Sequence, residues 1–130
     1  MNLWLDDIRS PPEDGIWWWA KTADEAIWFL ENFRVDWASL DHDLADEHYL
    51  LQDRADHAEK TGYSVAYWMA ENDIWPSVGV AVHSANVVGA ERIIGVVDRY
   101  GPYRVNCRWE PRDLQGNPWP ARINFALALR

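Results

Sequence analysis

The chain has 130 residues, and its 48% hydrophobic and 25% charged residues are ordinary for one folded domain with a buried core. A formal net charge of −9 argues against non-specific binding to nucleic acid, which requires a basic surface. The single cysteine, Cys107, excludes an intramolecular disulfide. The sequence shows neither a leader-peptide pattern nor an apolar run of about 20 residues, so we expect a cytoplasmic protein with no membrane partner.

The N-terminal quarter of the chain predicts two strands and a helix. Residues 2–5 have the alternation of a short strand, and a loop follows because prolines and a glycine between residues 10 and 15 break regular structure. Residues 16–20 are rich in aromatic side chains, which favour a second strand. Thr22 precedes a segment of helical periodicity and is its predicted N-cap.

The middle of the chain predicts two further strands around a helix. Residues 35–40 form the third predicted strand, and residues 78–82 form an apolar run typical of a central strand buried on both faces. Between them, residues 45–60 are charged and polar, and either a surface helix or a solvated flap fits them. A helix is predicted to begin at residues 61–63.

The last third of the chain predicts one helix and a hairpin. The helix follows Gly89 and is stopped by Gly101 and the proline after it. Residues 103–109 and 122–129 both alternate, which predicts an antiparallel hairpin at one edge of the sheet. Because strands and helices alternate up to that point, the predicted class is α/β with a mainly parallel sheet, in a single domain over residues 1–130.

Polar residues follow the predicted strands at the points where burial should end. Asp6 and Asp7 follow the first strand and Asp41 follows the third. Because open α/β sheets place their sites at the carboxyl ends of strands, we expect these side chains to form one site. Neighbouring carboxylates repel one another unless they share a cation, so the three acids predict a site for Mg²⁺ or Mn²⁺, with Zn²⁺ as the alternative if histidines also bind.

Two histidines lie beside these acids in the predicted arrangement. His42 follows Asp41 directly, and His83 ends the apolar run of the fourth strand. Imidazoles titrate near neutral pH, so Asp41, His42 and His83 are the predicted catalytic residues, and Asp43 either orients a histidine or completes the metal shell. Either histidine could instead have a purely structural role.

Three further polar residues are predicted to bind phosphate. Arg9 could hold a phosphate through its guanidinium fork, although an ion pair with Glu13 or Asp14 is the alternative. Ser84 and Asn86 precede a predicted helix, whose free N–H groups form an anion site. The alternative is that these two residues only cap that helix.

The chain also contains ten tryptophans, more than a core of this size requires. Trp17 and Trp19 are expected to face one side of their strand and Trp18 the other. These three side chains could stack on a nucleotide base, and packing in the core and at the sheet edge is the alternative.

Four segments occur together in an order that resembles a known family. They are residues 5–9 (LDDIR), 39–44 (SLDHDL), 61–63 (TGY) with Trp68, and 83–86 (HSAN) with Gly89. This pattern resembles the cyclic-phosphate processing receiver-like domain family, which is related to the receiver domains of response regulators. The resemblance covers about residues 1–100 and leaves residues 101–130 as a C-terminal β extension.

The resemblance implies a receiver-like (flavodoxin-like) fold in which the usual first helix is reduced to the loop of residues 10–15. It matches Asp6 and Asp7 to the acid pair that binds metal in receivers, Asp41 to the phosphoacceptor position, and Ser84 to the Ser/Thr switch position. The lysine of receivers has no clear counterpart, and Arg108 is the nearest candidate.

The leading hypothesis for function follows from the acids, the histidines and the resemblance together. It is a metal-dependent phosphoesterase that processes a cyclic phosphate, such as a 2′,3′-cyclic nucleotide or RNA end or ADP-ribose 1″,2″-cyclic phosphate. Two alternatives remain open. One is a non-catalytic module that binds a nucleotide, a metal or a protein partner, and the other is a phosphoacceptor receiver in which Asp41 is phosphorylated.

Overall fold

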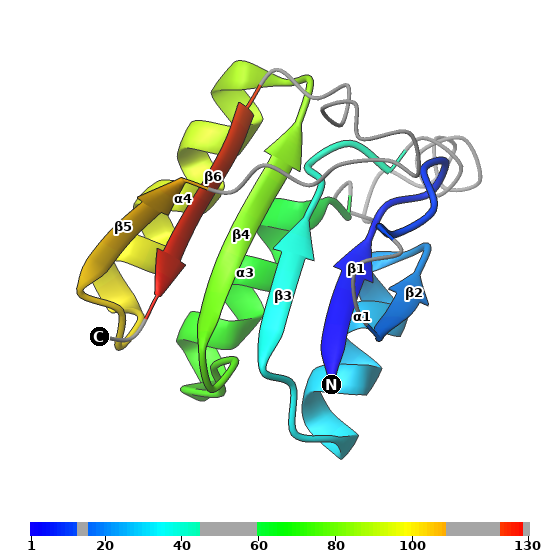
Figure 1. Ribbon diagram of the computed structural model, residues 1–130, viewed down its shortest axis with the longest axis horizontal. Coiled ribbons are helices and arrows are strands. Elements are labelled where there is room, and N and C mark those ends of the chain that lie inside the picture. The colour runs from blue at the N-terminus through cyan, green and yellow to red at the C-terminus, as the bar shows by residue number, and fades with distance from the viewer. Residues whose placement is uncertain (13–15, 45–59, 109–122, 129–130) are drawn as a thin grey trace.

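The computed structural model describes residues 1–12, 16–44, 60–108 and 123–128. Within them, one six-stranded sheet carries three helices, and all three lie on the same face of the sheet (Figure 1). None of these helices is long and apolar enough to cross a bilayer. The predicted α/β class is confirmed.

The sheet has the order β2-β1-β3-β4-β6-β5. Its strands are β1 (Asn2–Leu5), β2 (Trp17–Ala20), β3 (Trp37–Leu40), β4 (Gly79–Ser84), β5 (Val105–Arg108) and β6 (Ile123–Ala128). The first four pair in parallel, in the order that flavodoxin-like folds share. In the fifth position lies β6, antiparallel to both β4 and β5, so the predicted C-terminal hairpin at one edge is also confirmed.

The helices are α1 (Ala23–Asn32), α3 (Gly62–Asn72) and α4 (Val87–Tyr100). Each begins after a side chain that caps its first turn: Thr22 for α1, Thr61 for α3 and Asn86 for α4. No helix occurs in the described residues between β1 and β2, as expected for a receiver-like fold whose first helix is reduced. The alternative structures considered for residues 45–60 lie outside the described part of the chain, apart from Lys60.

One strand boundary matters for the site. The fourth strand was predicted from the apolar run of residues 78–82, and β4 runs from Gly79 through Ser84. His83 and Ser84 are therefore inside the sheet and fully buried, not in a loop that follows it. A polar residue continues a buried strand when the sheet supplies hydrogen-bond partners, and both residues have them.

The two faces of the sheet have different compositions. On the helix side, aliphatic residues of the strands and helices form the core: Leu3, Leu5, Leu40, Val80 and Val82 with Leu30, Val65, Met69, Ile93 and Val97. On the opposite side, alternation places Trp4, Ser39 and His83, all with no exposed surface. This second face thus combines burial with polar atoms, and it leads to the carboxyl ends of β1, β3 and β4.

Candidate functional site

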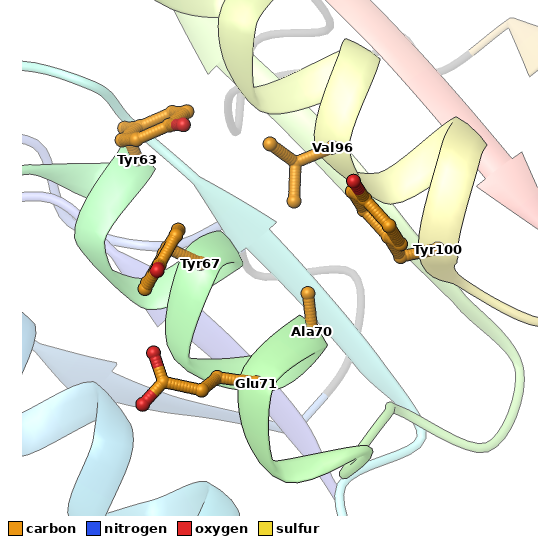
Figure 2. Close-up of a pocket in the computed structure, with 6 residues that line it drawn as sticks. All are labelled: Tyr63, Tyr67, Ala70, Glu71, Val96 and Tyr100. Atoms are coloured by element: carbon orange, nitrogen blue, oxygen red, sulfur yellow. The ribbon is translucent and has the colours of Figure 1, made fainter.

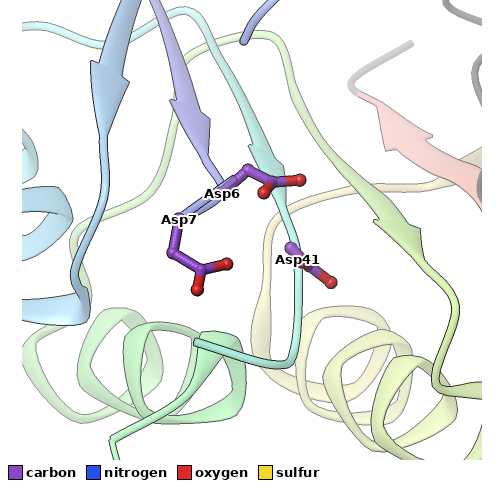
Figure 3. Close-up of side chains that lie close together, drawn as sticks. All are labelled: Asp6, Asp7 and Asp41. Carbon is purple, nitrogen blue, oxygen red and sulfur yellow. The ribbon is translucent and has the colours of Figure 1, made fainter. Parts of the chain in front are cut away.

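Three carboxylates gather where the neighbouring strands β1 and β3 end (Figure 3). Asp6, Asp7 and Asp41 each offer one oxygen, and these oxygens all lie within 4.8 Å of one another. The parallel register of Leu5 with Leu40 brings the acids together, because each follows the last residue of its strand. Oxygens this close can share one divalent cation, so the predicted grouping of the three acids is confirmed.

The electrostatics of Asp41 also fit a bound cation. Burial, and next the negative charges of Asp6 and Asp43, raise the pKa of Asp41 from its ordinary 3.8 to about 7. A hydrogen bond with Ser84 only partly offsets this effect. The site therefore carries more negative charge than its own hydrogen bonds can stabilise, and a divalent cation would remove that imbalance.

Both carboxylate oxygens of Asp6 are engaged within the protein. Its Oδ1 accepts hydrogen bonds from the backbone N–H groups of Ile8 at 2.9 Å and Arg9 at 2.8 Å, and its Oδ2 lies 3.2 Å from Nε2 of His83. Burial alone would raise the pKa of Asp6, but the hydrogen bonds from His83 and the backbone lower it below its ordinary value. Asp6 is therefore a buried carboxylate that stays ionised.

His83 uses both ring nitrogens inside the protein. Its Nδ1 lies 2.7 Å from Oγ of Ser39, and its ring stacks on Trp4 at a centroid distance of 3.7 Å and an interplanar angle of 5°. Burial lowers the pKa of His83, and Asp6 raises it by less. His83 is thus a fully buried imidazole whose two nitrogens both contact groups of the protein, and the catalytic role predicted for it stays a prediction.

His42 lies in a much more open environment. Its Nδ1 is 2.8 Å from Oδ1 of Asp43, and the same oxygen accepts a hydrogen bond from Nδ2 of Asn86 at 3.1 Å. Partial burial would raise the pKa of Asp43, but the hydrogen bonds from His42 and Asn86 lower it below its ordinary value. Nε2 of His42 has no hydrogen-bond partner in the described part of the chain, so it is the nitrogen free for proton transfer.

Two glycines of the motifs make room for this arrangement. A Cβ on Gly62 would overlap the backbone carbonyl oxygen of Asp41, and a Cβ on Gly89 would overlap the imidazole of His42. The N–H of Gly62 also donates to the carbonyl of His42 at 3.0 Å. Helices α3 and α4 can therefore approach the segment after β3 only because each has glycine in its first turn.

The predicted phosphate-binding residues fall into two groups. Ser84 and Asn86 are engaged within the protein: Oγ of Ser84 accepts from the N–H of Asn86 at 3.1 Å, and Oδ1 of Asn86 accepts from the N–H of Gly89 at 2.9 Å. Arg9 has no ion pair for its guanidinium in the described ranges. The acids considered as its alternative partners lie at positions outside those ranges.

The three consecutive tryptophans of β2 contact other parts of the protein. Trp18 packs against aromatic residues of α1, whereas Trp17 meets the edge of Trp4 at 5.6 Å, so the predicted alternation of these two side chains is confirmed. Trp19 donates from Nε1 to the backbone oxygen of Asp6 at 2.6 Å. These contacts support the packing interpretation and make Trp19 part of the scaffold of the acid cluster.

Ser39 is the residue of the site that the sequence reading missed. No role in the site was predicted for Ser39, although it is the one polar residue in β3 and comes two positions before Asp41. A polar residue at an inward position of a short buried strand was the available signal. Its partner, His83, is 44 residues away in the sequence, so only the fold reveals the pair.

A separate groove of about 310 Å³ lies between α3 and α4 (Figure 2). Its lining residues are Tyr63, Tyr67, Ala70, Glu71, Val96 and Tyr100. It shares no residue with the acid cluster, and its walls are mostly aromatic and aliphatic. Phosphate chemistry is therefore better served by the acid cluster at the strand ends.

A family model for the cyclic-phosphate processing receiver domain matches residues 1–99. The chain belongs to this family. Comparison with curated proteins and with solved structures gave no match. The match of this cyclic-phosphate processing receiver domain ends at the last turn of α4, so the hairpin of β5 and β6 lies outside the part that the family shares.

The topology of this receiver domain also bears on Arg108, the nearest candidate for the receiver lysine. Arg108 lies on β5, which pairs only with β6 among the described strands. Because β6 separates β5 from β4, Arg108 is one strand further from the acid cluster than a residue next to β4 would be. The strand between β4 and Arg108 is β6, which runs antiparallel to β4, so Arg108 does not lie on a strand next to β4.

Proposed function

We propose that this receiver domain is a metal-dependent phosphoesterase that opens a cyclic phosphate on a nucleotide or an RNA end and releases a phosphate monoester. The observation that carries the proposal is the cluster of three carboxylate oxygens within 4.8 Å, in which the pKa of Asp41 is raised to about 7. Membership of a family named for cyclic-phosphate processing supports the substrate class.

Asp6, Asp7 and Asp41 would hold the cation. An all-oxygen set favours Mg²⁺ or Mn²⁺ over Zn²⁺, and His83 is already engaged at both nitrogens. When bound, such a cation neutralises phosphate oxygens and lowers the pKa of a bound water. The protein's own part is to keep the three carboxylates together and to hold Asp6 ionised through its hydrogen bonds.

His42 is the residue proposed to transfer the proton. Asp43 holds Nδ1, so Nε2 is left to protonate the ribose oxygen when its bond to phosphorus breaks and a water oxygen bonds to phosphorus. The Asp43 carboxylate orients the imidazole by its contact with Nδ1 at 2.8 Å. Asn86 fixes Asp43 and is itself fixed by the start of α4.

Arg9 is the residue proposed to bind the phosphate. The protein carries a net charge of −9, so a phosphate needs a local cationic group in addition to the metal. A guanidinium offers paired N–H donors to two phosphate oxygens, and Arg9 follows the acid pair on the same loop. Ser84 is proposed to act indirectly, through its hydrogen bond with Asp41.

The test is phosphorus NMR of the protein with 2′,3′-cyclic nucleotides and ADP-ribose 1″,2″-cyclic phosphate, each with Mg²⁺, Mn²⁺ or a chelator. We expect a monoester resonance that requires metal and that Asp41→Asn slows by more than about 100-fold. Asp98→Asn is the matched control, because Asp98 is an exposed carboxylate in the last turns of α4. It should leave turnover unchanged.

The same experiment separates the alternatives. Absence of turnover with every metal would overturn the phosphoesterase proposal. A rise in melting temperature with a cyclic phosphate, without turnover, would then indicate the binding module. A hydroxylamine-labile phosphate on Asp41 after incubation with acetyl phosphate would instead indicate a phosphoacceptor receiver.

A further inference from the structure

A chain of buried hydrogen bonds leads from the middle of β3 to the acid cluster. Ser39 Oγ lies 2.7 Å from Nδ1 of His83, and Nε2 of His83 lies 3.2 Å from Oδ2 of Asp6. Ser39 and His83 have no exposed surface and Asp6 is only 1% exposed. The three residues come from three neighbouring strand segments and form a relay on the face of the sheet opposite the described helices.

The Asp6 carboxylate determines which atoms donate and which accept along this relay. An ionised carboxylate can only accept hydrogen bonds, so Nε2 of His83 must carry the ring proton that faces Asp6. Nδ1 of the neutral ring is then an acceptor, and the hydroxyl of Ser39 must donate to it. Asp6 therefore sets the tautomer of His83, and the hydroxyl of Ser39 holds the ring in that orientation by donating to Nδ1.

These residue types are those of a Ser-His-Asp hydrolase, but the geometry excludes that role. A nucleophilic serine must reach a substrate, and Ser39 is fully buried. The imidazole is also covered on one side by Trp4, which stacks on it almost in parallel. The relay is therefore directed toward Asp6 and not toward a substrate.

We propose that Ser39 is a positioning residue for the metal site, acting through His83 on the carboxylate of Asp6. This inference rests on the proposed metal site. By holding the ring of His83 through Nδ1, Ser39 keeps the Nε2 donor on Oδ2 of Asp6, and the remaining lone pairs of that carboxylate stay directed at the cluster. Outer partners of this kind contribute about 10- to 100-fold to metal affinity in protein sites.

Among the described residues, His83 is the one side-chain donor to the Asp6 carboxylate. The backbone N–H groups of Ile8 and Arg9 hold Oδ1, and Nε1 of Trp4 fixes this loop by donating to the carbonyl of Arg9 at 2.8 Å. Oδ2 depends instead on the position of a side-chain ring. Without the hydroxyl of Ser39, Nδ1 loses its hydrogen bond and the ring is no longer held from that side, so the Nε2 donor and the carboxylate that it contacts can turn.

The experiment is a titration of the full chain with Mn²⁺, followed by electron paramagnetic resonance of the free ion. Ser39→Ala should weaken Mn²⁺ binding by about 10- to 100-fold. The matched control is Ser77→Ala, which removes a serine hydroxyl that donates to Oδ1 of Asp36 at 2.6 Å. Ser77 belongs to no part of the cluster, so this variant should lose some stability and bind Mn²⁺ as the wild type does.

A double-variant cycle shows whether Ser39 acts through His83. In His83→Gln the amide carries its N–H toward Asp6 and lacks the ring nitrogen that Ser39 contacts, so Mn²⁺ affinity should stay within about fivefold of wild type. Adding Ser39→Ala to His83→Gln should then have no further effect. An equal loss in both backgrounds would overturn the proposal, because Ser39 would be acting by another route.

Failure of this inference and failure of the proposed function give different results. If wild type binds no Mn²⁺, the metal site itself is wrong. If wild type binds Mn²⁺ and Ser39→Ala binds it equally well, only the relay is wrong. If Ser39→Ala does not fold, His83→Gln and His83→Leu decide the matter: binding retained by Gln and lost by Leu supports the relay, and equal affinities overturn it.

Discussion

The described part of the protein contains two imidazole–carboxylate pairs that differ mainly in burial. His42 and Asp43 lie 2.8 Å apart, with side chains 16% and 62% exposed. His83 and Asp6 lie 3.2 Å apart, with side chains 0% and 2% exposed. The same two functional groups therefore occur once at the surface and once inside the sheet.

Burial gives the two pairs different uses. A pair in contact with solvent loses little when it breaks, and its imidazole can exchange a proton with a bound molecule. A buried pair has no water to replace its hydrogen bonds, so breaking it leaves a desolvated charge. This difference supports the proposals that His42 transfers the proton and that His83 orients the Asp6 carboxylate.

The largest expected effect is a difference in stability between His83→Leu and His42→Leu. His83→Leu removes the donor to buried Asp6 and the acceptor for Ser39, and should lower the free energy of unfolding by about 3–4 kcal/mol. His42→Leu should cost about 1 kcal/mol or less. Urea denaturation of both variants without metal measures this difference, and similar losses would remove the distinction between the pairs.

Turnover should not follow stability in these variants, because His42→Leu costs less stability than His83→Leu but removes a residue proposed to act on the substrate. His42→Leu should stay folded and lose turnover, because it removes the nitrogen proposed to transfer the proton. Turnover retained by His42→Leu would assign the proton to another group.

Much of the fold was predictable because its signals are local. Thr22 and Asn86 begin helices through side-chain caps within three residues, and the alternation in each strand is visible over four to six residues. The clustering of Asp6 with Asp41 was also predictable, since parallel strands end at one edge of a sheet.

The roles of the histidines were not predictable, because they depend on distant partners. His83 follows an apolar run, and a polar residue there equally indicates the end of a strand or a buried position with partners. Its partners are 44 and 77 residues away in the sequence. Trp4 adds a contact of the same kind, since its ring covers an imidazole that no local pattern places beside it.

The next largest effect is the pH dependence of the free energy of unfolding, to which Asp41 and buried His83 contribute with opposite signs. The folded pKa of Asp41 is about 7 and its ordinary value is 3.8, so the folded state binds the proton more tightly. The free energy of unfolding contributed by this group therefore falls as pH rises from about 4 to about 7. His83 opposes it, because a lowered folded pKa makes its contribution rise with pH up to its ordinary 6.5.

Comparison of Asp41→Asn with wild type separates the contribution of Asp41 from that of His83. Asp41→Asn should become more stable than wild type as pH rises, by about 2 kcal/mol at pH 8, after the roughly 4 kcal/mol of the full shift is reduced for partial exposure to solvent. Saturating Mg²⁺ should stabilise wild type and leave the variant nearly unchanged. Thermal denaturation from pH 4 to pH 8 measures both, and parallel curves for the two proteins would contradict the raised pKa.

The smallest expected effect compares two glycines of α4 under the same substitution. Gly95→Ala adds a methyl group where no atom lies within 4 Å, so it should stabilise the helix by about 0.5–1 kcal/mol. Gly89→Ala adds the methyl group against the imidazole of His42, so the ring must move away from Asp43. That strain should cancel the gain in helix propensity and lower stability by up to about 1 kcal/mol.

Turnover of the same two glycine variants tests whether the position of His42 beside Asp43 matters for catalysis. If the position of His42 matters, Gly89→Ala should slow turnover by about tenfold while Gly95→Ala leaves it unchanged, since a misplaced acid transfers its proton poorly. Equal turnover in both variants would mean that His42 tolerates displacement. The position of His42 beside Asp43 would then not matter for turnover, and the proton would have to come from water at the metal site.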